Sequence, residues 1–389
     1  MLRRSCMSAP VFSSFQFKPG HAVLLLSAGF LLFLGARSNA SALTPHDARG
    51  EAPAGTTCQT SDSGFDESKD IYAVRNYEYR IAQLLNDENF ELLDCISEAA
   101  RSGKARLPGG AWKIHRIYFG LDEPRPGRHA SEDDWNGHLA RLEHWVVVNP
   151  DSITARVALA KSYVGYAWEA RGSGTSDTVS DTAWKLFSHR LQRAKSILED
   201  ASSLKAKCPE WYVAMQQVAL GEGLEPAQAN QLLEEAVKFE AGYYYYYRMQ
   251  ANFLLPKWYG KEGDSSRFAE ESANRVGGKQ GDALYFLIAT QVACACGEPE
   301  FGRFSWSRIQ RGFQEIEKEY GQSMTNLNAY ALMAVSERDS VEAHRAFQRI
   351  GSNWDQETWR REAYFNQSKE WAEHAAPVVP AARKLPPAN

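Results

Sequence analysis

The histidines and acidic residues are the side chains of this sequence whose types could support catalysis or metal binding. His138 and His144 lie six residues apart, without the i, i+4 spacing of zinc-binding histidines on a helix. The acidic run at residues 132–134 falls at a predicted helix start, where carboxylates interact favourably with the helix dipole without any catalytic role. His115, on a short amphipathic segment, is the histidine best suited to a site, with a packed or solvated ring as the alternative.

Recognised motifs for nucleophilic catalysis, phosphate binding and metal binding are absent from the sequence. The closest glycine-rich stretch, Arg171-Gly172-Ser173-Gly174, follows a predicted helix and not a strand, so it does not predict a phosphate loop. The sequence therefore predicts no catalytic residue, no cofactor and no metal. The alternative is an acid or base supplied by distant helices, with Glu169 and His115 as examples.

Aromatic residues are the stronger candidates for a binding site. Five consecutive tyrosines occupy residues 243–247, and 100° per residue spreads them around a whole helix. They are expected to lie mostly in the core, with their hydroxyls bonded to neighbouring loops. Alternatively, some of them, with Tyr244 and Tyr246 as the candidates, line a binding groove.

Two further aromatic segments are candidates for partner binding. Trp258 and Tyr259 occupy a polar, glycine-bearing connection, where they could recognise a partner, or Trp258 could cover the helix ends as a plug. Trp168, Glu169 and Arg171 lie at a predicted helix end beside a glycine- and serine-rich insertion. They could form a polar rim, or Glu169 and Arg171 could form a structural contact.

The elements that must position these residues are helices. Between residues 66 and 375, apolar residues recur at intervals of three and four, which predicts an all-α domain of roughly thirteen helices. Ser131, Pro150 and Pro209 are predicted to mark helix ends, as are Gly221 with Gly223, Pro256 and the Gly277-Gly278 pair. Residues 41–65 and the proline-rich residues 376–389 are expected to be a disordered leader and tail.

Partial repeats indicate that these helices pair as in tetratricopeptide repeats. Small and large residues recur at second-helix spacing three times, at Ala194/Leu198/Ala201, Ala229/Leu233/Ala236 and Ala343/Phe347/Ile350. Small residues let paired helices approach, and large ones fill the space beside them. A strict 34-residue period is absent, so the predicted fold class is an irregular, solenoid-like array of α-α repeats.

Three segments resemble a family of uncharacterised bacterial proteins with tetratricopeptide-like helices. They are Ser152–Arg156 with Tyr166–Gly172, then Lys207–Tyr212, then Leu254–Gly260. The resemblance extends over most of residues 66–375. It implies a helical repeat fold and a bacterial origin, and it brings no known substrate or catalytic residue.

The N-terminus predicts export. A basic start, an apolar run at residues 22–36 and Ser38-Asn39-Ala40 are typical of a signal peptide covering residues 1–40, with a retained membrane anchor as the alternative. Removing it leaves 40 basic and 48 acidic residues, a net charge of −8, which argues against nucleic-acid binding. Cys58 could bridge to Cys95, or Cys95 could be a buried thiol.

These patterns predict a non-catalytic protein- or peptide-binding helical repeat protein of the bacterial cell envelope, periplasmic or secreted. Aromatic residues make up 12% of the chain, which suits recognition of peptides, proteins or sugars. The alternatives are an envelope enzyme that acts on a polymer, and a protein that binds a carbohydrate or small ligand.

Overall fold

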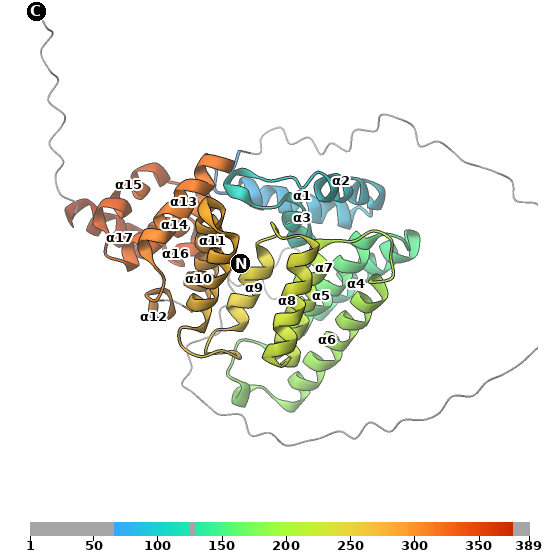
Figure 1. The fold of residues 1–389 in the computed structure, drawn as a ribbon. Helices are drawn as coiled ribbons and strands as arrows, with labels where there is room; N and C mark the ends of the chain where they lie inside the picture. The colour runs from blue at the N-terminus through green and yellow to red at the C-terminus, as the bar shows by residue number, and fades with distance from the viewer. Residues whose placement is uncertain (1–65, 125–129, 297, 376–389) are drawn as a thin grey trace, which may run out of the picture.

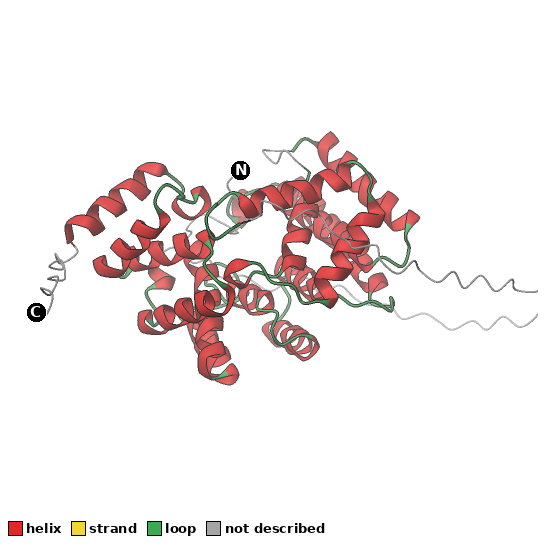
Figure 2. Cartoon of the chain, turned by 90° about the horizontal axis from the view of Figure 1, so that it is seen from above, coloured by secondary structure: helices red, strands yellow, loops and turns green. Residues whose placement is uncertain are grey.

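A computed structural model describes residues 66–124, 130–296 and 298–375, which form an all-α helical repeat array (Figure 1). The described helices are α1 (Ala73–Asn86), α2 (Phe90–Ser102), η1 (Pro108–Gly110), α3 (Lys113–Leu121), α4 (Glu132–Val148), α5 (Ile153–Arg171), η2 (Ser176–Thr178), α6 (Asp181–Ala201), α7 (Pro209–Glu222), α8 (Pro226–Phe239), α9 (Tyr245–Phe253), α10 (Asp264–Val276), α11 (Gly278–Cys296), α12 (Glu298–Phe301), α13 (Trp306–Tyr320), α14 (Met324–Ser336), α15 (Ser340–Ile350), α16 (Gln356–Trp359) and α17 (Glu362–Ala375). Coloured by secondary structure, the described residues show helices and loops without a strand (Figure 2). The predicted fold class is therefore confirmed.

Helix ends follow the local signals in the sequence. Ser131 caps α4 and forms a reciprocal capping box with Asp134, so two backbone N–H groups at the helix start are satisfied. Pro209 opens α7, where a missing N–H costs nothing, and Gly223 ends that helix in the left-handed conformation. Gly277 ends α10 at φ 76°. These predicted boundaries are confirmed.

The paired helices pack through the small and large residues of the partial repeats. α5 packs on α6, α7 on α8, and α14 on α15. All nine residues of the second-helix pattern are buried: Ala194, Leu198, Ala201, Ala229, Leu233, Ala236, Ala343, Phe347 and Ile350. Each pair thus buries one face on its partner, as repeat packing requires.

Helix α9 begins within the tyrosine run and not at its first residue. Tyr243 and Tyr244 lie in the turn before it, and Tyr245 is its first residue. All five tyrosine side chains are buried, with 0–7% of their surface exposed. The expected core position is therefore confirmed, because α9 packs against α7, α8, α10 and α11.

The first part of the described chain meets a much later part along a seam, which we define as the contacts of residues 67–68 and 106–110 with residues 320–326. The Glu67 carbonyl accepts from Met324 N–H at 3.1 Å, and Ser323 donates to the Glu67 carboxyl at 2.5 Å. Asn326 donates to the Gly109 carbonyl at 2.9 Å. In Figure 1, the helices of the N-terminal part lie along one edge of the array and reach α13. These bonds therefore connect two parts of the array that are far apart in the sequence.

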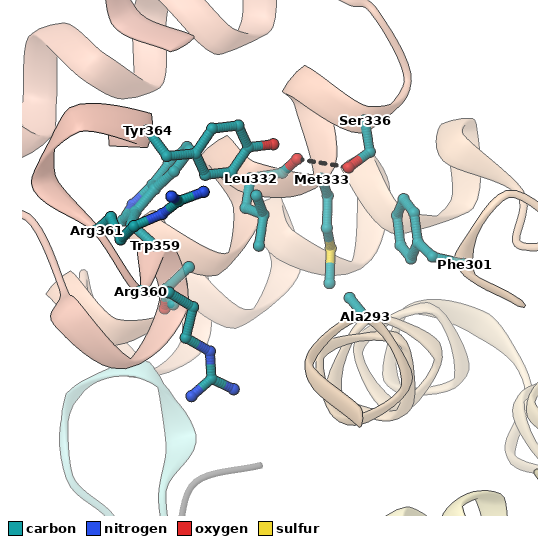
Figure 3. Close-up of a pocket in the computed structure, with 10 residues that line it drawn as sticks. Ala293, Phe301, Leu332, Met333, Ser336, Trp359, Arg360, Arg361 and Tyr364 are labelled. Carbon is teal, nitrogen blue, oxygen red and sulfur yellow. Dashed lines mark hydrogen bonds between the residues drawn. The ribbon is translucent and has the colours of Figure 1, made fainter. Parts of the chain in front are cut away.

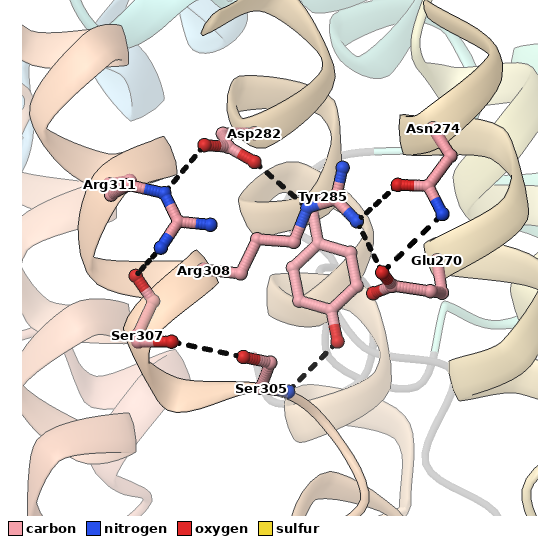
Figure 4. Close-up of polar contacts among 8 residues, drawn as sticks. All are labelled: Glu270, Asn274, Asp282, Tyr285, Ser305, Ser307, Arg308 and Arg311. Atoms are coloured by element: carbon pink, nitrogen blue, oxygen red, sulfur yellow. Dashed lines mark hydrogen bonds and ion pairs between the residues drawn. The ribbon is translucent and has the colours of Figure 1, made fainter. Parts of the chain in front are cut away.

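A buried arginine joins three helices of the array (Figure 4). Arg308 of α13 donates to Asp282 of α11 at 2.8 Å and to Glu270 of α10 at 2.7 Å. It also donates to Asn274 at 2.8 Å, and its guanidinium lies 4.9 Å from the Tyr285 ring centroid. These bonds fix α10 and α13 against α11, and the charge of Arg308 is balanced by two carboxylates.

The predicted leader, the predicted tail and the proposed signal peptide lie outside the described residues. No helix in the described part of the chain has the length and apolarity needed to cross a membrane. Cys95 is disulfide-bonded, which excludes the buried-thiol interpretation, and Cys58 lies outside the described residues.

Candidate functional site

The most concentrated group of buried ionisable side chains surrounds Glu210, in the first turn of α7. Its side chain is 0% exposed, and its carboxylate accepts hydrogen bonds from three other elements. His115 Nδ1 of α3 lies 2.6 Å from Oε1, while Lys161 of α5 bonds to Oε2. Tyr243, in the turn before α9, donates to Oε1. We call Glu210, His115, Lys161 and Tyr243 the Glu210 cluster.

The charges of the Glu210 cluster follow from burial and neighbouring groups. Burial acts to raise the pKa of Glu210, but Lys161 and His115 outweigh it and lower that pKa to about 2. Burial lowers the pKa of His115 to about 4, against the opposing effect of Glu210. At neutral pH the cluster therefore holds one carboxylate, one ammonium and a neutral imidazole.

The position of the proton on His115 follows from this arrangement. An ionised carboxylate only accepts hydrogen bonds, so Nδ1 carries the proton and donates to Glu210. The ring stacks on Tyr245 with centroids 3.5 Å apart, and its side chain remains 16% exposed. Nε2 has no hydrogen-bond partner in the described part of the chain and is not among its fully buried atoms. His115 thus has the oriented, neutral form that a general base needs.

The structure links the candidate Tyr244 to His115 through Tyr245. Tyr244 donates its hydroxyl to that of Tyr245 at 2.9 Å, and Tyr245 stacks on His115. Tyr246 points elsewhere, with its ring 5.2 Å from that of Tyr243 and 6.0 Å from that of Tyr212. The hydroxyl of Tyr246 is buried without a hydrogen-bond partner among the described residues.

The remaining aromatic candidates form a second group at the end of α5. Trp168 and Trp258 meet edge to face at 5.6 Å, and Trp258 is partly buried against the core. Tyr259 is 40% exposed, and its hydroxyl donates to the Leu220 carbonyl at 3.1 Å. Trp258 thus packs over the ends of these helices, as the plug interpretation describes.

Glu169 and Arg171 do not form with each other the contact that the sequence suggested. Arg171 donates to the carbonyls of Gly172 and Gly174 at 3.2 and 3.1 Å, and its guanidinium lies 5.6 Å from the Trp168 ring centroid. Glu169 is exposed. Arg171 therefore holds the loop after α5, and its hydrogen bonds replace the expected Glu–Arg contact.

A pocket of about 270 Å³ lies where α14 and the α16–α17 turn meet α11 and α12 (Figure 3). Its apolar surface comes from Ala293, Phe301, Leu332, Met333 and Trp359. Its polar lining comes from Ser336, Thr358, Arg360, Arg361 and Tyr364. We call this site the C-terminal pocket.

Two consecutive arginines give the C-terminal pocket its charge. No Asp or Glu is among its lining residues. Arg361 is exposed and forms no ion pair within the described residues. Arg360 ends α16 at φ 63°, ψ −40°, a backbone conformation that costs a non-glycine residue on the order of 1–3 kcal/mol. Strain of this kind concentrates at functional positions, so we regard this pocket as a candidate binding site.

Sequence reasoning found His115 but missed the residues that surround it. Lys161 could have indicated this cluster, because it is the one charged residue in the otherwise uncharged stretch from Val157 to Ala167. A lysine in a buried helix needs an acidic partner to balance its charge. Glu210 gave no signal of its own. It follows Pro209 in the first turn of a helix, where an acidic residue is expected simply because it interacts favourably with the helix dipole. The C-terminal pocket gave no signal, because its lining comes from separate helices.

Within the described residues, no group of three or more His, Cys, Asp or Glu side chains is placed to hold a metal ion. The Glu210 cluster has only one carboxylate, and its ammonium would repel a cation. Neither the family models, the curated proteins nor the solved structures compared with this chain give a match.

Proposed function

We propose that this chain is a non-catalytic binding protein of the cell envelope that recognises a protein or peptide partner. The C-terminal pocket is the observation that carries the proposal. It combines an apolar interior with two arginines and lacks an acidic lining residue. A ligand with an apolar body and one negative charge satisfies both features.

The free C-terminus of a peptide is the peptide group with this chemistry. Its last side chain enters the apolar part between Leu332 and Trp359, and its carboxylate pairs with Arg361. Carboxylate–guanidinium bonds are among the stronger hydrogen bonds in proteins because both partners are charged. A volume of about 270 Å³ is at the low end for ligand sites, which suits one residue better than a long polymer.

Export is part of the proposal and has independent support from the disulfide at Cys95. Disulfides persist in the oxidising compartments outside the cytosol. The apolar run at residues 22–36 supplies the signal, and cleavage after Ala40 releases the mature chain. Cell fractionation with mass spectrometry of the mature N-terminus tests this step, and a mature protein that begins at Met1 in the cytosol contradicts it.

Binding of short peptides tests the recognition step. We would titrate the purified mature chain with fluorescent tetrapeptides that end in Ala, Leu or Phe, each with a free and an amidated C-terminus. We expect the free Leu and Phe peptides to bind best and amidation to weaken binding roughly tenfold or more, the effect of losing a charged hydrogen bond. Equal binding of acid and amide, or no binding by any member, overturns the proposed mode.

Two variants locate the peptide site. Arg361→Gln removes the proposed partner of the carboxylate, so it should bind the acid as weakly as wild type binds the amide. Arg345→Gln, at an exposed arginine on α15, is the matched control and should bind like wild type. If both variants retain full affinity, the carboxylate is not held in the C-terminal pocket.

An enzyme is the second candidate function, and one observation favours it. Glu210 orients a neutral His115 whose Nε2 has no partner in the described residues. Such a ring can accept a proton from a substrate or water. Mass spectrometry of the same peptides after incubation tests it: products that appear with wild type and disappear with His115→Gln support hydrolysis, and unchanged peptides argue against it.

A further inference from the structure

Two arginines lie near Tyr245, outside the C-terminal pocket. Arg248 of α9 has its guanidinium carbon 5.7 Å from the Tyr245 ring centroid. The same ring stacks at 3.5 Å on His115, which precedes Arg116 in α3. Burial lowers the pKa of Arg248, and the positive charge of Arg116 lowers it further. The two guanidinium groups are thus close enough to repel each other.

The positive charge of this arginine pair is only partly balanced. Arg116 donates to Glu78 at 3.2 Å through one terminal nitrogen. Arg248 donates to the neutral Gln291 at 2.9 Å and forms no ion pair with any described residue. The carboxyl of Glu67 also interacts electrostatically with Arg116. Arg248 is therefore the cation of the pair without a carboxylate partner, in a region where desolvation makes an unbalanced charge costly.

Each guanidinium retains a donor that a ligand can reach. The Nε atoms of Arg116 and Arg248 are buried and lack a hydrogen-bond partner. Nη2 of Arg116 and Nη1 of Arg248 also form no hydrogen bond among the described residues, but neither is a fully buried atom. The Arg116 side chain is 17% exposed, and although burial acts to lower its pKa, neighbouring groups that include Glu78 and Glu67 raise it. The free donors therefore belong to side chains that are only partly buried.

Tyr245 adds a neutral donor between the two charges. Its hydroxyl oxygen accepts from Tyr244, which leaves its own hydrogen to donate. The three donors belong to different side chains. A planar carboxylate is best matched by two donors of one guanidinium, whereas a tetrahedral anion has oxygens that point in several directions. The arrangement favours the tetrahedral anion.

We propose that Arg116, Arg248 and Tyr245 bind a phosphate group, either as free phosphate or as the phosphate of a monoester. Arg248 contributes the charge that has no carboxylate partner, and Arg116 contributes its unused terminal nitrogen. Phosphate carries three or more acceptor oxygens and between one and two negative charges near neutral pH. It would thus balance the charge of the arginine pair. This site is separate from the C-terminal pocket, so either can fail without the other.

Calorimetric titration with inorganic phosphate tests the site directly. The buffer is held at pH 7.5 and constant ionic strength with chloride, so that general screening does not change during the titration. We expect saturable binding of phosphate by wild type and none of acetate. Arg248→Gln should weaken phosphate binding roughly ten- to hundredfold, as expected for loss of a charged hydrogen bond. Arg248→Lys should fall between the two, because lysine keeps the charge without the planar fork.

Controls separate a specific site from general attraction to a protein surface. Arg193→Gln, at an arginine on α6 whose guanidinium lies 6.0 Å from the Tyr163 ring centroid, should bind phosphate like wild type. Circular dichroism in phosphate-free buffer checks that Arg248→Gln is folded. If acetate and phosphate bind equally, or Arg248→Gln binds like wild type, the proposal is wrong. A phosphoserine peptide that binds more tightly than phosphate identifies an esterified ligand, and equal affinity identifies the free ion.

Discussion

Lys161→Met should be among the most destabilising single substitutions in this chain. The side chain is 4% exposed and its ammonium pairs with Glu210, which is 0% exposed. The substitution leaves a buried carboxylate with only two neutral donors, His115 and Tyr243. Removing one partner of a buried ion pair costs about 3–5 kcal/mol, because the remaining charge is uncompensated. With an unfolding entropy of about 2.1 cal/mol/K per residue and about 300 residues, that corresponds to a fall in melting temperature of very roughly 5–8 °C.

A double-mutant cycle distinguishes this cause from simple loss of packing. In the double variant Lys161→Met/Glu210→Gln no unpaired charge remains, and the amide oxygen still accepts from His115 and Tyr243. We therefore expect the double variant to be more stable than Lys161→Met alone, with a coupling energy of about 1–3 kcal/mol. Chemical denaturation at pH 7, followed by circular dichroism at 222 nm, measures the four free energies of unfolding.

An exposed ion pair provides the matched control for this cycle. Lys195 and Glu222 are 2.9 Å apart with side chains 38% and 24% exposed. Lys195→Met should cost no more than about 1 kcal/mol. The reasoning fails if Lys161→Met costs as little as Lys195→Met, or if the double variant is destabilised by the full sum of the single effects.

Three other perturbations test the local structure. Burial lowers the pKa of His115 to about 4 from an ordinary 6.5, so the unfolded chain binds a proton at higher pH than the folded chain does. The free energy of unfolding should therefore fall by up to about 3 kcal/mol as the pH is lowered from 6.5 to 4. His115→Asn should make the free energy of unfolding less dependent on pH over this range. Ser131→Ala removes the side-chain acceptor of the α4 capping box and should lower the free energy of unfolding by about 1 kcal/mol, measured by urea denaturation, whereas Ser131→Asp should retain most of the stability. Gly312→Ala places a Cβ 2.0 Å from the Asp282 carbonyl oxygen, so α13 must move away from α11. We expect the free energy of unfolding to fall by about 1–3 kcal/mol, measured by thermal denaturation. An unchanged melting temperature would contradict this close packing.

Short-range patterns predicted the helices well because their causes are local. The capping box at Ser131 needs residues only three positions apart, and Pro209 marks a helix start through its own missing N–H. The buried face of α15 follows from Ala343, Phe347 and Ile350, which recur at helical spacing. These elements could be predicted without knowledge of what they pack against.

The sites depend on contacts that spacing along the chain does not reveal. His115 and Glu210 are 95 residues apart, and Lys161 lies between them on a third helix. The sequence indicated that His115 deserved notice but gave no means of choosing its partner among 48 acidic residues. In the tyrosine run, helical geometry predicted a core position but not the direction of each hydroxyl, since Tyr243 bonds to Glu210 while Tyr246 has no described partner.

The seam gives the chain a different folding order from that of an open solenoid. In an open array, repeats interact with their neighbours and structure can grow from any point. Here Glu67 bonds to Ser323, a separation of 256 residues, so this contact cannot form during synthesis until more than four-fifths of the chain has been made. Contacts of such long range form slowly, because the loop must close before the bonds stabilise it. The N-terminal side of the seam therefore stays unpaired during synthesis until residues 320–326 have been made.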